Sequence, residues 1–183
     1  MEIIIVLGVI ALVVLFFVAQ YNRLIRLTIS VDEAWAQIEV QLKRRADLIP
    51  NLVETVKGYA KHEQSTFDAV VTARAKATTA STVADTAAAD GMLTQALRGL
   101  LAVAEAYPDL KASANFISLQ EELATTENKV AFSRQFYNDN VRELNTAVKT
   151  VPTNFFAGFA KVNEREFYEV EDPQDRKAPS VKF

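Results

Sequence analysis

The stretch FISLQEELATTENKVAFSRQFYNDNVRELNTAVKTV, residues 116–151, has the clearest period in the chain. Apolar or aromatic side chains recur at every seventh position, at Phe116, Leu123, Val130, Tyr137, Leu144 and Val151. A repeat of seven that is kept over this length predicts a long α-helix that packs against other helices, as in a coiled coil. Pro152 follows, and we expect the helix to end there because proline lacks the backbone N–H.

Residues 30–77 carry a second helical pattern. Ser30 and Glu33 form a capping box, which is typical of a helix start. Apolar residues then recur mostly at steps of three and four, at Val31, Trp35, Ile38, Leu42, Ile49, Leu52, Val56 and Tyr59. Pro50 lies inside this pattern, so we expect a kink near Ala46–Pro50 before the helix resumes and runs to about Ala77.

The remaining segments after residue 77 are less regular. Residues 78–89 are rich in Thr and Ala, which predicts a mobile connector or a frayed helix. Residues 91–106 predict a shorter helix that ends at Tyr107-Pro108-Asp109. Residues 162–183 are charged and contain proline, so we expect a C-terminal tail there.

The N-terminal run from Ile3 to Ala19 has no charged residue and, as a helix, would be roughly 26 Å long. That length is close to the lower limit for crossing a bilayer, and Tyr21 follows where an aromatic ring favours the interface. A cleaved signal peptide is the alternative, but the run lacks a basic start and has Phe17 where a small residue is needed. We therefore predict an uncleaved transmembrane helix over residues 3–22, with Ile3, Leu7, Val14 and Ala19 among its transmembrane residues.

The basic residues near this run predict its orientation. Arg23 and Arg26 follow the run, and no basic residue precedes it. The positive-inside rule then places the N-terminus outside and the rest of the chain in the cytoplasm. We predict a single-pass protein of the bacterial inner membrane.

The composition favours helices throughout. The chain has 183 residues, 50% of them hydrophobic, with five Gly and five Pro, too few turn formers for an all-β fold. The fold predicted is all-α: an N-terminal transmembrane helix followed by an elongated antiparallel helical bundle of three to four helices. The expected segments are an outer end at 1–2, the span at 3–22, the bundle at 23–161 and the tail at 162–183.

Several classes of chemistry lack their residues. The chain has no Cys, which excludes disulfides, thiolate metal sites and thiol nucleophiles, and its net charge of −3 argues against nucleic-acid binding. His62-Glu63 is the start of a zinc-protease motif, but position 66, where the second His belongs, is Thr66. We expect no metal, no cofactor and no catalytic residue set.

A charged cluster lies just before Pro50. Arg44 and Asp47 are three residues apart and could pair on the helix surface. Arg45 falls on the apolar side, where its stem either snorkels to solvent or its guanidinium joins a buried polar network. The candidate partners on the helix 116–151 are Glu127, Asn128, Asn138 and Asp139.

Phe155, Phe156 and Phe159 surround Gly158 after the last long helix. We expect this cluster to cap the end of the bundle; a membrane or partner contact is the alternative.

Six stretches along the chain carry a family resemblance. Trp35-Ala-Gln-Ile, Leu42-Lys-Arg-Arg-Ala-Asp-Leu-Ile-Pro-Asn-Leu-Val and Val56-Lys-Gly-Tyr-Ala-Lys-His-Glu resemble the LemA family, as do residues 126–145, 152–155 and 178–183. The structural or partner candidates are Trp35, Arg44, Arg45, Asp47, Pro50, Asn51, Asn128, Tyr137, Asn138, Phe155 and Phe156.

The resemblance implies a single-pass bacterial membrane protein with a helical cytoplasmic domain and no known catalytic residues. Family members are often found beside membrane metalloproteases, and a magnetosome membrane protein carries a similar domain. We therefore expect a non-catalytic membrane-anchored scaffold or adaptor. The alternatives are a regulator or partner of a membrane protease and, less favoured, a hydrolase that uses carboxylates.

The predicted helix lengths suggest association. Two helices of roughly 60 Å cannot be covered by one of roughly 24 Å, so part of the apolar seam should remain open. We expect a homo-oligomer or a membrane protein partner on that seam, besides the bilayer around the N-terminal helix.

Overall fold

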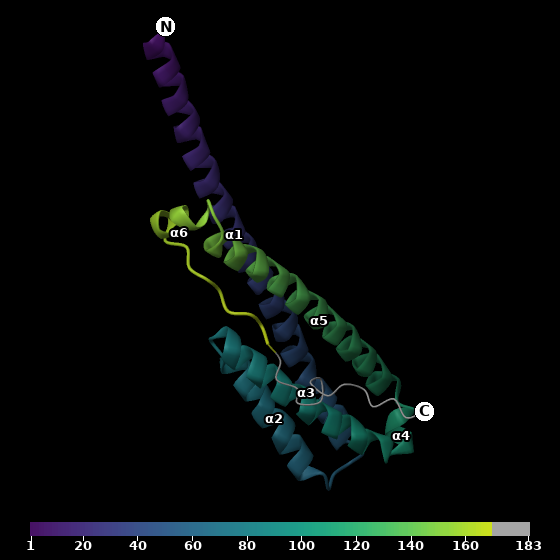
Figure 1. Ribbon diagram of the computed structural model, residues 1–183. Helices are drawn as coiled ribbons and strands as arrows, with labels where there is room; N and C mark the ends of the chain where they lie inside the picture. The colour runs from purple at the N-terminus through teal and green to yellow at the C-terminus, as the bar shows by residue number, and fades with distance from the viewer. Residues whose placement is uncertain (170–183) are drawn as a thin grey trace, which may run out of the picture. The chain divides into compact units, whose positions relative to one another are not determined.

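The structure, a computed structural model, describes residues 1–169. Helices cover most of these residues, and the described part contains no strand (Figure 1), as the sequence predicted. The helices are α1 (Glu2–Lys57), α2 (Gln64–Thr79), α3 (Val83–Glu105), α4 (Pro108–Lys111), α5 (Ala114–Lys149) and α6 (Asn154–Ala160). Most of the predicted tail, residues 170–183, lies outside the described part.

The chain divides into two compact units, to both of which α1 and α5 contribute. The first unit contains Met1–Ile38 and Ser133–Phe167. The second contains Glu39–Phe132 and, after the first unit, the described residues from Tyr168 on. The candidate site described below lies in the second unit, and the exposed apolar helix lies in the first.

Helix α1 is continuous from Glu2 to Lys57, which corrects the helix start predicted at Ser30. Ser30 lies inside the helix and does not start it, and Pro50 does not interrupt it. The predicted continuation to Ala77 is also wrong, because the helix ends at Lys57 and α2 starts only at Gln64. Gly58, a residue of low helix propensity, directly follows the last helical residue.

Pro50 is tolerated inside α1 because another residue replaces the hydrogen bond that it cannot make. A proline at position 50 has no N–H to donate to the carbonyl of Ala46, four residues earlier. Nε of Arg74, on α2, donates to that carbonyl oxygen at 2.8 Å. The ring of Pro50 itself faces solvent. The neighbouring helix thus satisfies the carbonyl that the proline leaves free.

Helix α3 starts earlier than predicted, at Val83, within the segment that we expected to be mobile or frayed. Thr82 is its N-cap: the Thr82 hydroxyl accepts a hydrogen bond from the Asp85 N–H at 3.0 Å and donates one to the Asp85 carboxylate at 2.7 Å. Ala87 and Ala89 are buried. Small side chains allow close packing here, so the helix needs no large apolar residue.

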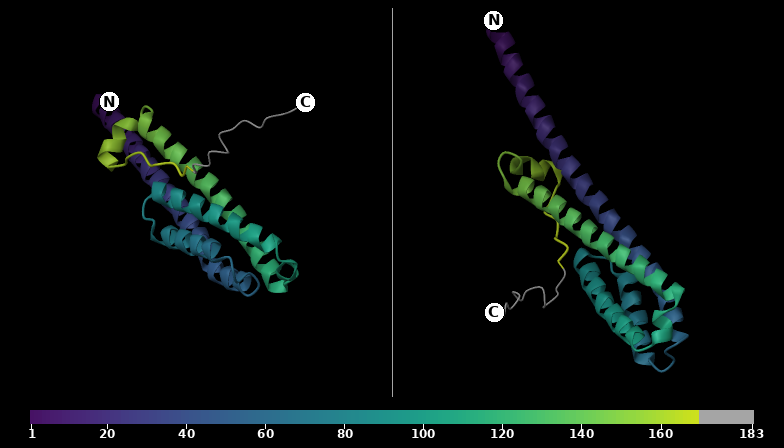
Figure 2. Two further views of the ribbon diagram at one scale, coloured as in Figure 1. Left: turned by 90° about the horizontal axis from the view of Figure 1, so that it is seen from below. Right: turned by 90° about the vertical axis from the view of Figure 1, so that its right-hand side faces the viewer.

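The second unit has a hydrophobic core that draws on five helices. Helices α2 and α3 lie side by side (Figure 1, Figure 2), and α4 follows α3. The buried residues of this core include Ile49, Leu52 and Val56 of α1, Phe67 and Val70 of α2, Leu93, Leu97 and Leu100 of α3, Leu110 of α4, and Phe116 and Leu123 of α5. Burying each such large side chain contributes about 1.5–3 kcal/mol to stability.

The first unit pairs the N-terminal part of α1 with the C-terminal part of α5. The ring of Trp35 lies 5.4 Å from that of Tyr137, centroid to centroid. Leu24, Val31 and Ile38 are buried on α1. Helix α5 ends at Lys149, close to the end predicted from Pro152.

The apolar seam is largely covered within one chain. On α1, Ile49 and Val56 are buried, and on α5 every residue of the seven-residue repeat from Phe116 to Leu144 is buried. Helix α2 and an α3 that is longer than predicted both contribute to the hydrophobic core that contains Ile49. Trp35 and Leu42 of the same stripe are half-buried, and the homo-oligomer stays a prediction.

Candidate functional site

Arg45 is the centre of a buried charged cluster in the second unit. Its Nη1 lies 2.6 Å from Oδ1 of Asp90 on α3, and its Nη2 lies 2.7 Å from Oε2 of Glu127 on α5. The side chains of Arg45 and Asp90 are each 3% exposed, whereas that of Glu127 is 38% exposed. The predicted contact with a carboxylate of the 116–151 helix is confirmed, and Arg45 does not snorkel to solvent.

Two hydroxyl groups complete the cluster. The Thr94 hydroxyl accepts from Nη2 of Arg45 at 2.9 Å and donates to the backbone carbonyl of Asp90 at 3.0 Å. The Tyr168 hydroxyl donates to Oδ2 of Asp90 at 3.2 Å. Tyr168 therefore belongs to the buried cluster of the second unit.

The cluster joins helices α1, α3 and α5 through one side chain. Two carboxylates face one guanidinium, and Nε of Arg45 is buried without a hydrogen-bond partner among the described residues. A guanidinium shared by two carboxylates makes charge-assisted hydrogen bonds of fixed geometry. The arrangement fits a structural clamp that selects one packing of the three helices.

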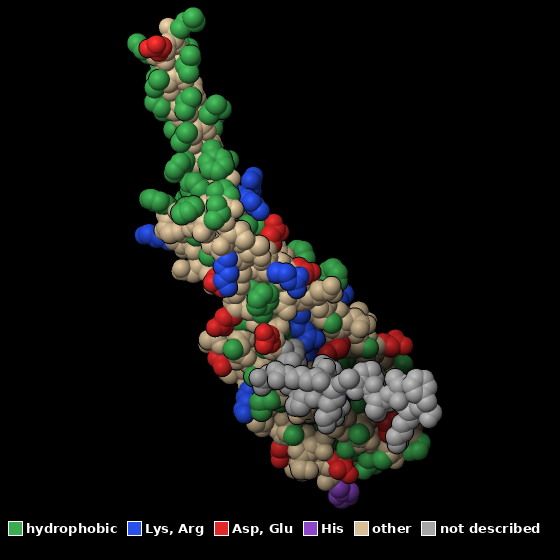
Figure 3. Space-filling view, in the orientation of Figure 1, with side chains coloured by type: hydrophobic (Ala, Val, Ile, Leu, Met, Phe, Trp, Pro, Cys, Tyr) green, Lys and Arg blue, Asp and Glu red, His purple; other side chains and the backbone are tan. Residues whose placement is uncertain are grey.

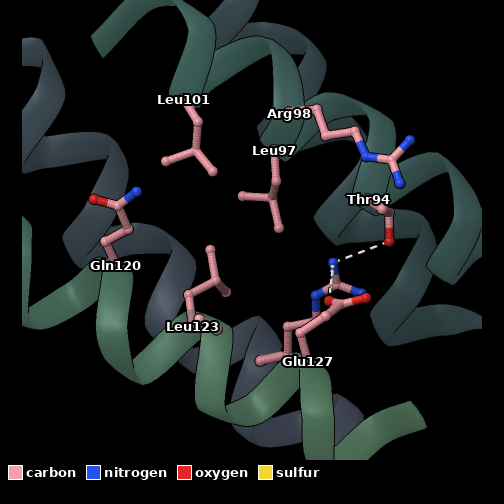
Figure 4. A pocket seen from close by; sticks show the side chains of 9 residues that line it. Thr94, Leu97, Arg98, Leu101, Gln120, Leu123 and Glu127 are labelled. Atoms are coloured by element: carbon pink, nitrogen blue, oxygen red, sulfur yellow. Dashed lines mark hydrogen bonds and ion pairs between the residues drawn. The ribbon is translucent and has the colours of Figure 1, made fainter. Parts of the chain in front are cut away.

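A cavity of about 260 Å³ lies beside this clamp. Figure 4 shows Leu97, Leu101 and Leu123 directed toward its centre, with Glu127 and Thr94 at one end. Arg98, Gln120, Ala124 and Arg45 complete its lining. The walls are mainly apolar, and at one end Arg45 and Glu127 form an ion pair with each other.

Within the described residues 1–169, no group of three or more His, Asp or Glu side chains is placed to hold a metal ion. His62 is exposed in the turn between α1 and α2. The polar atoms that the clamp gathers serve ion pairs and hydrogen bonds: the Tyr168 hydroxyl donates to Asp90, whose carboxylate also binds Arg45.

The other candidate residues near Arg45 are exposed. Arg44 is exposed, and the ion pair of Asp47 is with Lys43, at 3.7 Å, and not with Arg44 as suggested from the sequence. Asn51 is exposed, and its carbonyl accepts from the Thr55 hydroxyl at 2.7 Å.

The α5 candidates differ in exposure. Asn128 is exposed and Asn138 half-buried, whereas Tyr137 is buried and Asp139 pairs with Arg142 at 2.8 Å. Of the four partners suggested for Arg45, Glu127 is the one that contacts it.

Sequence analysis missed Asp90, Thr94 and Tyr168. Asp90 follows an alanine-rich run and precedes Leu93 and Leu97 by three and seven residues, which places it on the buried side of a helix. An acidic residue in that register is a detectable signal for a buried ion pair. Tyr168 lies in a charged segment without periodicity, and no such signal marks it.

In the first unit, an extended segment after α6 makes hydrogen bonds and an ion pair with residues of α1 and α5. The side chain of Asn145 accepts from the backbone N–H of Arg165 and donates to its carbonyl, both at 2.9 Å. The Arg165 guanidinium reaches Asp32 on α1 at 3.0 Å, and the Tyr137 hydroxyl donates to the carbonyl of Glu166 at 2.9 Å. We call residues 161–168 the strap.

The pKa of Tyr137, whose hydroxyl donates to the strap, is raised. Burial raises the pKa of Tyr137 above its usual 10.0; Glu166 and Asp32 add to the rise, and Arg165 opposes it. The rise extends to higher pH the range in which the phenol keeps the proton that it donates to the strap.

The N-terminal part of α1 is the other notable feature. It contains a window of mean hydropathy 3.1 of which none is buried, and α1 is the one helix among the described residues long and apolar enough to cross a membrane. Figure 3 shows hydrophobic side chains covering this part of the helix. The feature is compatible with a single-pass membrane protein.

The fold and these features define an all-helical protein with one exposed, apolar N-terminal helix. The chain belongs to the LemA family, whose model matches residues 34–183. It is also similar to Protein LemA of Metamycoplasma hominis, with 25% identity over 142 residues. That match covers 77% of this chain and 65% of the relative, so the chain spans less than two thirds of the relative's length.

Proposed function

We propose that this protein is a membrane-anchored helical scaffold or adaptor of the bacterial cell envelope, which acts through protein–protein contacts and not by catalysis. The observation that carries the proposal is the contrast between the two units. The first presents an apolar helix with unburied side chains from Ile3 to Val18. The second uses its buried charges to hold its own helices together.

A bilayer is the natural environment for the apolar part of α1. Its backbone groups are bonded within the helix, as the hydrocarbon region requires, and its side chains carry no charge from Ile3 to Ala19. Arg23 and Arg26, which follow, are exposed and favour the cytoplasmic side. We propose an inner-membrane location, with residue 1 outside and the helices after residue 22 in the cytoplasm.

The two carboxylates of the clamp, which a carboxylate-based hydrolase could use, both form ion pairs with Arg45. Asp90 and Glu127 both bind Arg45, and Asp90 also accepts from Tyr168. A general acid–base pair needs a carboxylate that is free to exchange a proton with substrate. The clamp therefore supports a structural role.

The experiment is capture of the tagged full-length chain from detergent-solubilised bacterial membranes after cross-linking. The matched control keeps residues 1–29 and replaces the rest with an unrelated soluble domain. We expect a membrane protein to be captured in stoichiometric amount by the full chain and not by the control, and captured again when the partner carries the tag.

The outcomes separate the candidate functions. A captured membrane protease whose turnover changes when this protein is added would define the role as regulation of that enzyme. Capture by both proteins alike, or turnover of hydrolase substrates by the purified protein alone, would overturn the scaffold proposal.

A further inference from the structure

Helix α6 exposes two phenylalanine rings one helical turn apart. Phe155 is 68% exposed and Phe159 is 83% exposed, whereas Phe156 is 7% exposed. Residues four apart share one face of a helix, so the exposed rings of Phe155 and Phe159 form a single apolar face. Sequence analysis expected all three to cap the helices, and only Phe156 is buried.

The buried ring of Phe156 packs against the apolar part of α1. Phe156 lies 4.8 Å from Phe17 and 6.0 Å from Phe16, centroid to centroid, in edge-to-face contacts. The Thr153 hydroxyl lies 3.4 Å from the side-chain oxygen of Gln20. Helix α6 is therefore level with residues 16–20, where the charge-free run of α1 ends.

Basic residues begin where this apolar surface stops. Arg23 and Arg26 are exposed on the next turns of α1, and Lys161, also exposed, directly follows α6. Apolar and aromatic side chains on one side of a boundary and Lys or Arg on the other are typical of a membrane interface.

We propose that α6 is an interfacial membrane foot, which inserts Phe155 and Phe159 into the boundary between headgroups and acyl chains. The proposal rests on the proposed membrane crossing of α1 and extends it to a second element. The occupant is the lipid bilayer, because the exposed face is continuous with the unburied apolar helix through Phe156, Phe16 and Phe17. The foot fixes how deeply α1 sits and orients the first unit toward the membrane.

Fluorophores on single cysteines can test the foot without altering either phenylalanine. The chain has no Cys, and a Cβ added at Gly158 of α6, at Gly8 of the apolar run or at Gly99 of α3 meets nothing within 4 Å. Each of Gly158→Cys, Gly8→Cys and Gly99→Cys is labelled with bimane. The labelled full-length proteins are reconstituted into vesicles of phosphatidylcholine and phosphatidylglycerol.

The readouts are emission wavelength, quenching by nitroxide lipids of two depths, and quenching by aqueous iodide. At position 158 we expect a blue shift, loss of most emission with the shallow nitroxide lipid, and protection from iodide. At position 8 the deep nitroxide lipid should quench more, and at position 99 only iodide should quench. Phe155→Ser with Phe159→Ser should return the label at 158 to the behaviour of position 99, while secondary structure stays unchanged.

Two results would overturn the foot while leaving the anchor intact. In one, the label at Gly8 is quenched by lipid but that at Gly158 only by iodide. In the other, Gly158 is protected from iodide without any lipid quenching, which indicates that protein covers the rings. If the label at Gly8 also escapes lipid quenching, the membrane crossing itself is wrong, and the foot fails with it.

Discussion

Nη1 of Arg45 and Oδ1 of Asp90 lie 2.6 Å apart, although 45 residues separate them in the chain, and both side chains are only 3% exposed. The cost of desolvating two charges offsets much of their attraction, so such a pair adds little net stability over an apolar pair. We infer that the pair acts mainly by selecting one packing of α1 on α3.

Removing one partner of this pair should be costly. We expect Arg45→Ala to lower the free energy of unfolding by about 3–5 kcal/mol, because Asp90 is left charged and buried. Arg44→Ala, its exposed neighbour, should change the same quantity by less than about 0.5 kcal/mol. Urea unfolding of the full chain in detergent micelles, followed by near-ultraviolet circular dichroism, measures both. Arg45→Met with Asp90→Leu should recover most of the loss, and equal small effects of the two alanine variants would contradict the clamp.

The contact between Arg74 and Ala46 predicts a coupling between two helices. Arg74→Ala should cost about 1–3 kcal/mol of unfolding free energy, because the carbonyl of Ala46 loses its donor. Pro50→Ala restores a backbone N–H that donates to the same carbonyl. In that background Arg74→Ala should cost less, with a coupling energy of at least about 0.5 kcal/mol in a double-mutant cycle. Strictly additive effects would show that Arg74 does not compensate for the proline.

The strap depends on the side chain of Asn145. Asn145→Ala removes both hydrogen bonds to the backbone of Arg165, so the strap should detach more often from α5. We expect trypsin to cut after Lys161 and Arg165 several times faster in the variant, as followed by mass spectrometry of the full chain. Asn128→Ala, at an exposed position on the same helix, is the control and should leave the rate unchanged.

The raised pKa of Tyr137 predicts a dependence on alkaline pH. Because burial holds the proton on the native phenol, the unfolded chain ionises first as the pH rises. The stabilisation is therefore complete below about pH 10 and is lost as the pH rises through the raised pKa. Tyr137→Phe cannot ionise, so its melting temperature should fall less steeply above about pH 10 than that of the unaltered chain. Tyr59→Phe, at an exposed tyrosine, should follow the unaltered chain.

The sequence predicted α5 well because its signal is local and repeated. Five of the six residues at the spacing of seven are buried, and only Val151, beyond the end of α5, is exposed. The start of α3 was missed for the opposite reason. Its signals are one capping threonine, Thr82, and buried alanines, and alanine is equally common on exposed helix faces.

Of the residues in the candidate site, Arg45 and Glu127 could be predicted from the sequence and Asp90 could not. The position of Arg45 on the apolar side of its helix requires a buried partner, and Glu127 was among the candidates. Asp90 was not, because its helix was expected to start at Gly91. Which residues meet a buried charge depends on how the helices pack, and no pattern within one helix contains that information.

The last prediction concerns orientation in the membrane. Arg23 and Arg26 follow the apolar run and Glu2 precedes it, so the positive-inside rule places residue 2 outside the cytoplasm. Because the chain has no Cys, Glu2→Cys and Thr125→Cys each provide one labelling site. A membrane-impermeant maleimide on intact spheroplasts should label position 2 at once and position 125 only after lysis. Glu2→Lys combined with Arg23→Glu and Arg26→Glu moves the basic bias to the other end, and Thr125→Cys should then become labelled on intact cells. Labelling of position 125 from outside in the otherwise unaltered chain would show that the orientation is the reverse of the one proposed.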